Sequence, residues 1–247
     1  MLRLIDGEIY RLLHKKSIYI YFFSLAVGYL LIAYIRSGGF TAESIITDAF
    51  NFFNVLPAAA GGFLFSAIYT DDLAAKNLIA LVGSGMSKTK IVLAKFILTA
   101  LFGAVIFVLA PLLLFVVHAA FGWTATTSAM VMVFAVSFKH LLVTLGYSAL
   151  AGIAVYGLQR ATFAMVLYIL FAFNIVGGLI TVFLVNMVGA SSAAVIMSRL
   201  MAGITDRILA GMTGGGSLLS PVIDYIIYIA AAIVVSVIAF NKKEMEF

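Results

Sequence analysis

A glycine-rich stretch that leads into a lysine and a threonine, GSGMSKT at residues 83–89, is the first place where this chain could do chemistry. Such residues bind nucleotide phosphates when a glycine, four further residues and then Gly-Lys-Ser/Thr follow a strand. Aligning Lys88 and Thr89 with that pattern places Ser87 and Val82 at the two glycine positions, and no strand pattern precedes them. We therefore expect no nucleotide-binding site and no enzymatic activity in this chain.

Nucleophilic and metal chemistry have equally little support. The chain has no cysteine, which excludes disulfides, thiol nucleophiles and thiolate metal sites. Its three histidines are isolated, and no H-E-x-x-H pattern is present. His118 stands near Trp123 at the end of an apolar segment, where both are interpreted as membrane-interface residues. We expect no catalytic, cofactor-binding or metal-binding residue.

Four polar side chains could still contact a transported substrate. Lys139 and His140 interrupt an apolar segment, and a lysine at mid-bilayer costs about 2.5–3.5 kcal/mol. Two explanations for Lys139 and His140 stay open. Either they snorkel to the surface or pack within the bundle, or they contact a substrate or a gate. Arg199 and Arg207 are candidates for the same pathway or gating role.

The amino-acid composition is typical of a protein that lies in a lipid bilayer. Hydrophobic residues make up 64% of it and charged residues 10%, and the mean hydropathy is +1.19. These values predict an all-α integral membrane protein in which residues 1–247 form a single transmembrane domain. Six segments are long and apolar enough to span a bilayer, at about 17–35, 49–69, 93–117, 128–156, 163–187 and 221–240.

The basic residues between these segments are divided unequally. One side holds Arg3, Arg11, Lys15, Lys16, Lys76, Lys88, Lys90, Lys95, Arg160, Lys242 and Lys243, and the other holds Arg36, Arg199 and Arg207. Since basic loops stay in the cytoplasm, both termini and the 70–92 loop are predicted to be cytoplasmic. The net charge of +5 is thus explained by topology, and no nucleic acid partner is expected.

Two amphipathic helices are predicted outside the spans. Residues 1–16 repeat Leu2, Ile5, Ile9, Leu12 and Leu13 at helical spacing, which indicates an interfacial helix lying along the bilayer surface. It is either a simple anchor or a docking element. Residues 193–212 predict an external helix that Gly214, Gly215 and Gly216 close. That helix either forms a lid over an exit path or rests on the bundle.

The 70–92 loop is a polar, helix-prone region between two spans. Asp71 or Asp72 is expected to cap a helix over 73–82, and Gly83 ends it. Ser87 is expected to cap the next helix, whose residues Lys88, Lys90 and Lys95 would lie among lipid phosphates. The result is either a knob for a partner protein or an ordinary amphipathic loop.

Small residues favour close helix contact. Gly177 and Gly178 in the fifth segment are interpreted as packing residues or as a dimer seam. The 21 phenylalanines and 10 methionines suit an adaptable apolar path for amphipathic cargo, and they suit lipid contact equally well.

Taken together, the chain resembles a type-2 ABC transporter permease. More narrowly, it is similar to the small stand-alone permeases of bacteriocin-immunity, lantibiotic and amphipathic-peptide exporters, including the phenol-soluble-modulin type. The resemblance covers nearly the whole chain through the six spans, the interfacial helix, the external helical hairpin and a second-to-third-span loop with an acidic residue, Lys76, Asn77, Gly83, Ser87, Lys88, Ile91, Ala94 and Lys95.

The resemblance carries several implications. The loop would be a coupling helix that contacts a separate ABC ATPase through Asp71, Asp72, Lys76, Asn77, Gly83 and Lys88. That ATPase would hold ATP and Mg²⁺, and a second permease, identical or paralogous, would complete the pathway. The cargo would be an amphipathic or antimicrobial peptide, or a lipid-like molecule, leaving through a bacterial cytoplasmic membrane. Asp71 and Asp72 stand where many relatives carry a glutamate, so the residue that contacts the ATPase is open.

A function of another class fits the same helices. A membrane immunity or scaffold protein that transports nothing would bind its target within the bilayer and would need no ATPase.

Overall fold

The computed structural model describes residues 2–35, 42–74, 77–122 and 126–243. Throughout these ranges the chain is helical or forms short connections, and they contain no strand. The elements are α1 (Leu2–Leu13), α2 (Lys16–Ile35), α3 (Ala42–Leu56), η2 (Pro57–Gly61), α4 (Gly62–Phe65), η3 (Ser66–Thr70), α5 (Asp71–Ala74), α6 (Asn77–Gly83), α7 (Lys88–Ala120), α8 (Thr127–Leu158), α9 (Ala161–Ala172), α10 (Ile175–Val188), α11 (Ala190–Met197), α12 (Met201–Met212) and α13 (Leu219–Lys242).

Long apolar helices dominate the described residues. Four are long and apolar enough to cross a membrane: Ser44–Leu73, Lys88–Ala120, Thr127–Leu158 and Leu219–Lys242. Two further spans exist if bent pairs count as one span each. These pairs are Leu4–Leu13 with Lys16–Ile32, bent by 58°, and Ala161–Ala172 with Ile175–Val188, bent by 62°. The all-α fold is therefore confirmed for the described residues, with four to six candidate membrane spans.

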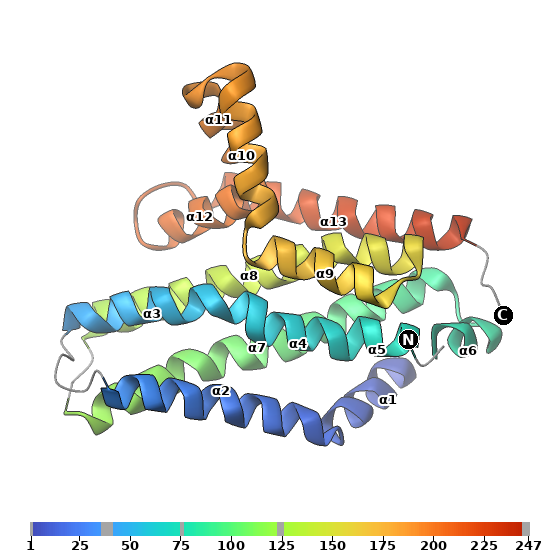
Figure 1. Cartoon of the computed structure of the whole chain (residues 1–247), viewed down its shortest axis with the longest axis horizontal. Coiled ribbons are helices and arrows are strands. Elements are labelled where there is room, and N and C mark those ends of the chain that lie inside the picture. The colour runs from blue at the N-terminus through green and yellow to red at the C-terminus, as the bar shows by residue number, and fades with distance from the viewer. Residues whose placement is uncertain (1, 36–41, 75–76, 123–125, 244–247) are drawn as a thin grey trace.

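The predicted fifth span, 163–187, is wrong as a single helix. It breaks after α9, where Asn174 adopts a left-handed conformation with φ of 55°, and resumes as α10. Asparagine tolerates this conformation better than most residues, because its short polar side chain bonds locally. Figure 1 shows the consequence, since α10 and α11 project away from the helices that lie along the long axis.

The second span is longer than predicted and contains two π-helical segments, η2 and η3. The prediction that Asp71 or Asp72 caps the start of a helix is wrong, because the helical backbone continues from η3 into α5. The backbone runs through Asp71 in the right-handed helical region, with φ of −63° and ψ of −36°. At the next helix start the prediction is confirmed in position: Ser87 precedes α7 in an extended conformation, although its side chain makes no capping bond.

Helix α8 lies at the centre of the bundle and packs against α3, α7, α9, α12 and α13. The largest fully buried side chains include Tyr156 of α8, Tyr168 of α9 and Phe65 of α4. In Figure 1, α6 lies at the same end of the bundle as α1 and the last turn of α13. One end of the molecule therefore gathers the loop helix and both terminal helices.

Both predicted surface helices differ in detail. Helix α1 forms, but Ile5 and Leu12 are buried against the protein, so the prediction that this stripe lies along the bilayer surface is wrong for them. Residues 193–212 form two helices, because Leu200 is extended between α11 and α12. The apolar side of α12, with Ile204 and Ile208, packs on the bundle. Gly214, with φ of 88°, follows α12 as predicted.

Candidate functional site

Glu8, Arg11, Asp72 and Lys95 form a cluster of charges, called the buried cluster, of which only Arg11 is substantially exposed, at 32%. The side chains of Asp72 and Lys95 are 0% and 1% exposed, and that of Glu8 is 10% exposed. Lys95 donates to Asp72 and lies 2.9 Å from Glu8 Oε1. Arg11 bonds Glu8 Oε2 at 2.7 Å and lies 3.2 Å from Asp72 Oδ1. Two carboxylates thus share two cations, so the buried cluster is electrically balanced.

Each member of the buried cluster comes from a position that local structure determines. Glu8 and Arg11 are three residues apart on α1, a spacing that brings helical side chains together. Arg11 also donates to the carbonyl oxygen of Ala67 at 3.1 Å, within the π-helical segment η3. A π-helical turn shifts the backbone bonding to i+5 and commonly marks functional positions. The other π-helical segment behaves similarly, since the Tyr168 hydroxyl donates to Pro57 O at 2.7 Å.

The free-energy cost of burying charges indicates that the buried cluster holds its helices in place. Removing buried charges from water is costly, and an apolar replacement of the whole set is often neutral or stabilising. Removing one partner leaves an uncompensated buried charge and costs about 3–5 kcal/mol. The buried cluster therefore fixes α1, α5 and α7 relative to one another.

Several residues that the resemblance assigns to the ATPase contact belong to this region. Asp72 is in the buried cluster and receives a hydrogen bond of 3.3 Å from Asn77, so its carboxylate faces inward. Asp71 is 37% exposed and pairs with Lys15. Gly83 is exposed at the end of α6. Lys76 lies outside the described residues. Whether Asp71, Asn77 and Gly83 touch a partner stays a prediction.

The placement of Lys95 among lipid phosphates is wrong, and that of Lys88 stays a prediction. Lys95 lies in the buried cluster. Lys88 donates to the carbonyl oxygens of Phe240 and Lys243, at 2.7 and 3.0 Å, and its ammonium lies 5.1 Å from the centre of the Phe240 ring. A cation at the carboxyl end of α13 is favoured by the helix dipole. Lys88 therefore ties the start of α7 to the end of α13.

The exposed part of the loop is small and mostly uncharged. Helix α6 buries Leu78 and exposes Ala80 and Gly83, and Ser84 and Gly85 follow, also exposed. Gly85 takes φ of 83°, which reverses the chain toward α7. On its two sides, Asp72 belongs to the buried cluster and Lys88 is hydrogen bonded to the end of α13.

A second set of ion pairs, the surface cluster, joins Lys139, Arg199, Asp206, Arg207 and Asp224. Lys139 of α8 lies 2.5 Å from Asp206 of α12. Arg199 and Arg207 converge on Asp224 of α13 at 3.0 and 2.7 Å. The structure thus brings three of the four candidate gating residues to the contacts of α12 with α8 and α13. The packing interpretation of Lys139 gains support, because its charge has a partner.

Two histidines, His140 and His118, make their contacts inside the helix bundle. His140, the fourth candidate gating residue, places Nε2 3.0 Å from Asn54 Oδ1 of α3 and Nδ1 2.8 Å from Val136 O. With the Asn54 amide rotated, a neutral ring satisfies both contacts. His118, predicted at the membrane interface, is instead fully buried, with Nε2 3.5 Å from Asp48 Oδ2. Trp123 lies outside the described residues.

Helix α10 carries the predicted dimer seam and differs from every span around it. It has no buried residue, and Leu179, Val182 and Phe183 are 61–68% exposed. Nothing lies within 4 Å of a Cβ built at Gly178. At Gly177 such an atom would meet only the side chain of Asn174. Within this chain, the two glycines therefore support no helix contact.

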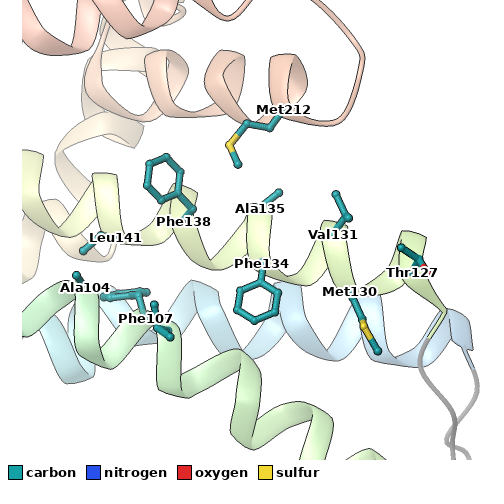
Figure 2. A pocket seen from close by; sticks show the side chains of 11 residues that line it. Ala104, Phe107, Thr127, Met130, Val131, Phe134, Ala135, Phe138, Leu141 and Met212 are labelled. Carbon is teal, nitrogen blue, oxygen red and sulfur yellow. The ribbon is translucent and has the colours of Figure 1, made fainter.

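Two apolar pockets open between the helices. One, of about 590 Å³, is lined by Thr127 and ten apolar residues of α7, α8 and α12. In Figure 2, Met212 reaches from α12 toward Phe138 and Ala135 of α8. The other, of about 580 Å³, lies among α2, α3 and α7. Both have the size of ordinary ligand sites, and their apolar walls suit acyl chains or apolar side chains.

Sequence reasoning missed Glu8 and the depth of Lys95, although a signal was present. Glu8 lies four residues after Leu4 and four before Leu12, on the buried side of α1. Lys95 lies four residues after Ile91 and three before Leu98, which are both fully buried. A charge within an apolar stripe at helical spacing predicts a buried partner.

Within the described ranges no three histidine or acidic side chains gather as metal ligands. Comparison with protein-family models, curated proteins and solved structures finds no match for the chain. The functional argument therefore rests on the sequence and the geometry.

Proposed function

We propose that this chain is the membrane-spanning subunit of an ABC exporter and that a separate ATPase docks on α6. One observation carries the proposal: a short, partly exposed helix lies between two long candidate spans whose adjacent ends are joined by the buried cluster. A partner that moves α6 would move α1, α5 and α7 together. Lys88 would extend that motion to α13 through its bonds to Phe240 and Lys243.

The orientation follows from charge. The α6 end of the bundle carries Arg11, Lys15, Lys88 and Lys95, and in this proposal it faces the cytoplasm with both termini. Counting each bent pair as one span gives the six spans that this orientation requires. ATP and Mg²⁺ would be bound by the partner.

The cargo would use the apolar pockets. Flexible methionines and aromatic rings such as Met130, Phe134 and Met212 adapt to varied apolar surfaces. These side chains suit amphipathic or antimicrobial peptides and lipid-like molecules. A second permease, an identical copy or a paralogue, would cover α10 near Gly177 and Gly178 and complete the pathway.

Copurification tests the ATPase contact. The detergent-extracted chain should retain an ABC ATPase, and the complex should hydrolyse ATP with vanadate sensitivity. Ala80→Arg, on the exposed side of α6, should abolish retention while leaving thermal stability unchanged. Tyr10→Arg adds the same charge at an exposed position of α1 at the same end and should retain the ATPase. Equal retention by wild type and Ala80→Arg would refute docking on α6.

Charge reversal at single residues of the loop tests which of them contact the ATPase. Reversal at Asp71 or Lys76 should weaken ATPase binding or transport without loss of membrane insertion. Asp72 is a poor probe, because its reversal would also disrupt the buried cluster.

The alternative is a non-transporting immunity or scaffold protein, and α10 supports it. An apolar helix with no buried residue offers a surface to a partner within the bilayer. In that case no ATPase would copurify, and a cross-linker placed at exposed Phe183 would capture the target protein and no second permease.

A further inference from the structure

The apolar pocket of about 580 Å³ among α2, α3 and α7, called the α2 groove, is open along one side. Its floor includes Leu56 and Ala60, which are at most 4% exposed. Its rim on α7 includes Val105, Leu109 and Val116, which are 56–66% exposed. The α2 groove therefore opens on the outer surface of the helix bundle, where a bilayer would meet a spanning protein.

The α2 groove is long enough to hold one acyl chain. Its lining residues on α7 extend from Phe102 to Val116. At a helical rise of 1.5 Å per residue this stretch is about 21 Å long. The hydrocarbon core of a bilayer is about 30 Å thick, so the chains of one leaflet extend over about 15 Å. One lipid chain therefore fits along α7.

One end of the α2 groove lies beside a free cation. Leu13 and Tyr19 line that end, at the bend between α1 and α2. Lys16 is the first residue of α2 and precedes Tyr19 by three positions, a spacing that brings helical side chains together. Lys16 is exposed, and its ammonium group has no partner among the described residues, whereas Lys15 is paired with Asp71. This end of the groove is therefore complementary to an anionic group attached to an apolar chain.

The other large pocket, which Met212 lines, differs in this respect. Its volume is similar, at about 590 Å³, and its walls are also apolar. Lys139 follows the lining residue Phe138 in the sequence, but its charge is paired with Asp206. The two pockets therefore differ in whether the neighbouring lysine is free to bind an anion.

We propose that the α2 groove binds one acyl chain of an anionic phospholipid and that Lys16 binds its phosphate group. The headgroup then lies at the end of the bundle that carries α1, from which α2 and α7 extend in the same direction (Figure 1). The chain lies along α7 and fills the space between α2 and α3. This proposal does not rest on transport, and a cargo in the pocket that Met212 lines would not compete with the lipid.

Lipid retention by charge variants tests the role of Lys16. The detergent-extracted chain is mixed with equal amounts of phosphatidylglycerol and zwitterionic phosphatidylcholine, and native mass spectrometry measures the lipid that each chain retains. The wild type should prefer phosphatidylglycerol, and Lys16→Gln should lower that preference about fivefold, as expected for one lysine at a lipid phosphate. Lys242→Gln removes the same charge from an exposed position at the same end, on α13, which contributes no residue to the groove, and should keep the preference. Equal retention of the two lipids by the wild type, or equal effects of the two lysine variants, would overturn the proposal.

A matched pair of alanine variants tests the groove itself. Ala26 lines the α2 groove and Ala104 lines the pocket beside Met212, and both are half-buried. Ala26→Phe should fill the groove and abolish phosphatidylglycerol retention, whereas Ala104→Phe should leave it unchanged. Full retention by a folded Ala26→Phe variant would contradict the proposal. If thermal unfolding shows that Ala26→Phe does not fold, the comparison of Lys16→Gln with Lys242→Gln still decides, because both lysines are exposed.

Glycerol 3-phosphate distinguishes a lipid from a soluble phosphate, because it has the anionic group without the chains. It should not displace phosphatidylglycerol at equal concentration, and displacement would show that Lys16 binds phosphate without help from the groove, against the proposal. Phosphatidylglycerol should also raise the melting temperature of the wild type more than that of Lys16→Gln, since a ligand of the folded state stabilises it in proportion to its affinity. Equal shifts for the two chains would overturn the assignment of Lys16.

Discussion

The buried cluster and the surface cluster use the same chemistry in different surroundings. In the buried cluster the side chains of Asp72 and Lys95 are at most 1% exposed, and three helical segments meet around them. In the surface cluster Asp206 and Arg199 are 61% and 64% exposed, and the ion pairs hold α12 against its neighbours. Water therefore screens the ion pairs of the surface cluster more than the pair of Asp72 and Lys95. Similar ion pairs should thus differ in strength because they differ in burial.

Removing one charge from the buried cluster should have the largest effect on stability. Asp72→Ala leaves Lys95 and Arg11 with Glu8 as the one remaining carboxylate of the cluster, so one buried positive charge is no longer balanced, and it should cost about 3–5 kcal/mol of folding free energy. Thermal unfolding in detergent micelles measures the loss. The double variant Asp72→Leu/Lys95→Met replaces the pair with apolar side chains of similar size and should recover most of the stability. A loss below about 1 kcal/mol for Asp72→Ala would mean that water reaches the pair.

The same contrast between packed and open surroundings applies to glycines. A Cβ at Gly61 would overlap the Tyr168 hydroxyl and lie 2.9 Å from Thr144 Cγ2, whereas one at Gly178 would meet nothing within 4 Å. Gly61→Ala should therefore cost about 1–3 kcal/mol. Gly178→Ala should be neutral or stabilise the monomer by up to about 1 kcal/mol, since alanine favours helix.

Two controls test whether steric overlap explains the loss at Gly61 and whether a dimer contact involves Gly178. Adding Tyr168→Phe to Gly61→Ala removes the overlapping hydroxyl, so the double variant should lose less than the sum of the single losses. Equal losses for Gly61→Ala and Gly178→Ala would contradict the difference in packing. If Gly178→Ala weakens self-association while the monomer stays stable, the dimer seam gains support.

Hydropathy predicted most of the span positions, because long apolar runs have few alternatives to helices in a bilayer. The break at Asn174 escaped prediction, since asparagine only tolerates a left-handed backbone and the run on both sides stays apolar. The buried cluster escaped for a different reason. The partner of a charge is set by which helices meet, and Glu8 and Lys95 are 87 residues apart in the sequence. The apolar spacing around each still indicated burial.

The smallest expected effect is in the surface cluster. A double-mutant cycle with Lys139→Ala and Asp206→Ala should give a coupling free energy of about 0.2–1 kcal/mol, because Asp206 faces solvent and the pair holds two flexible side chains in place. Raising the ionic strength from about 0.1 M to about 1 M shortens the screening length from about 10 Å to about 3 Å and should reduce that coupling. The corresponding cycle between Asp72 and Lys95 should hardly change with salt, since neither side chain meets the solvent. A salt-insensitive coupling free energy above about 2 kcal/mol for Lys139 and Asp206 would mean that this ion pair is as strong and as unscreened as those of the buried cluster. Helix α12 would then be fixed on α8, and a lid that opens by releasing this pair would be excluded.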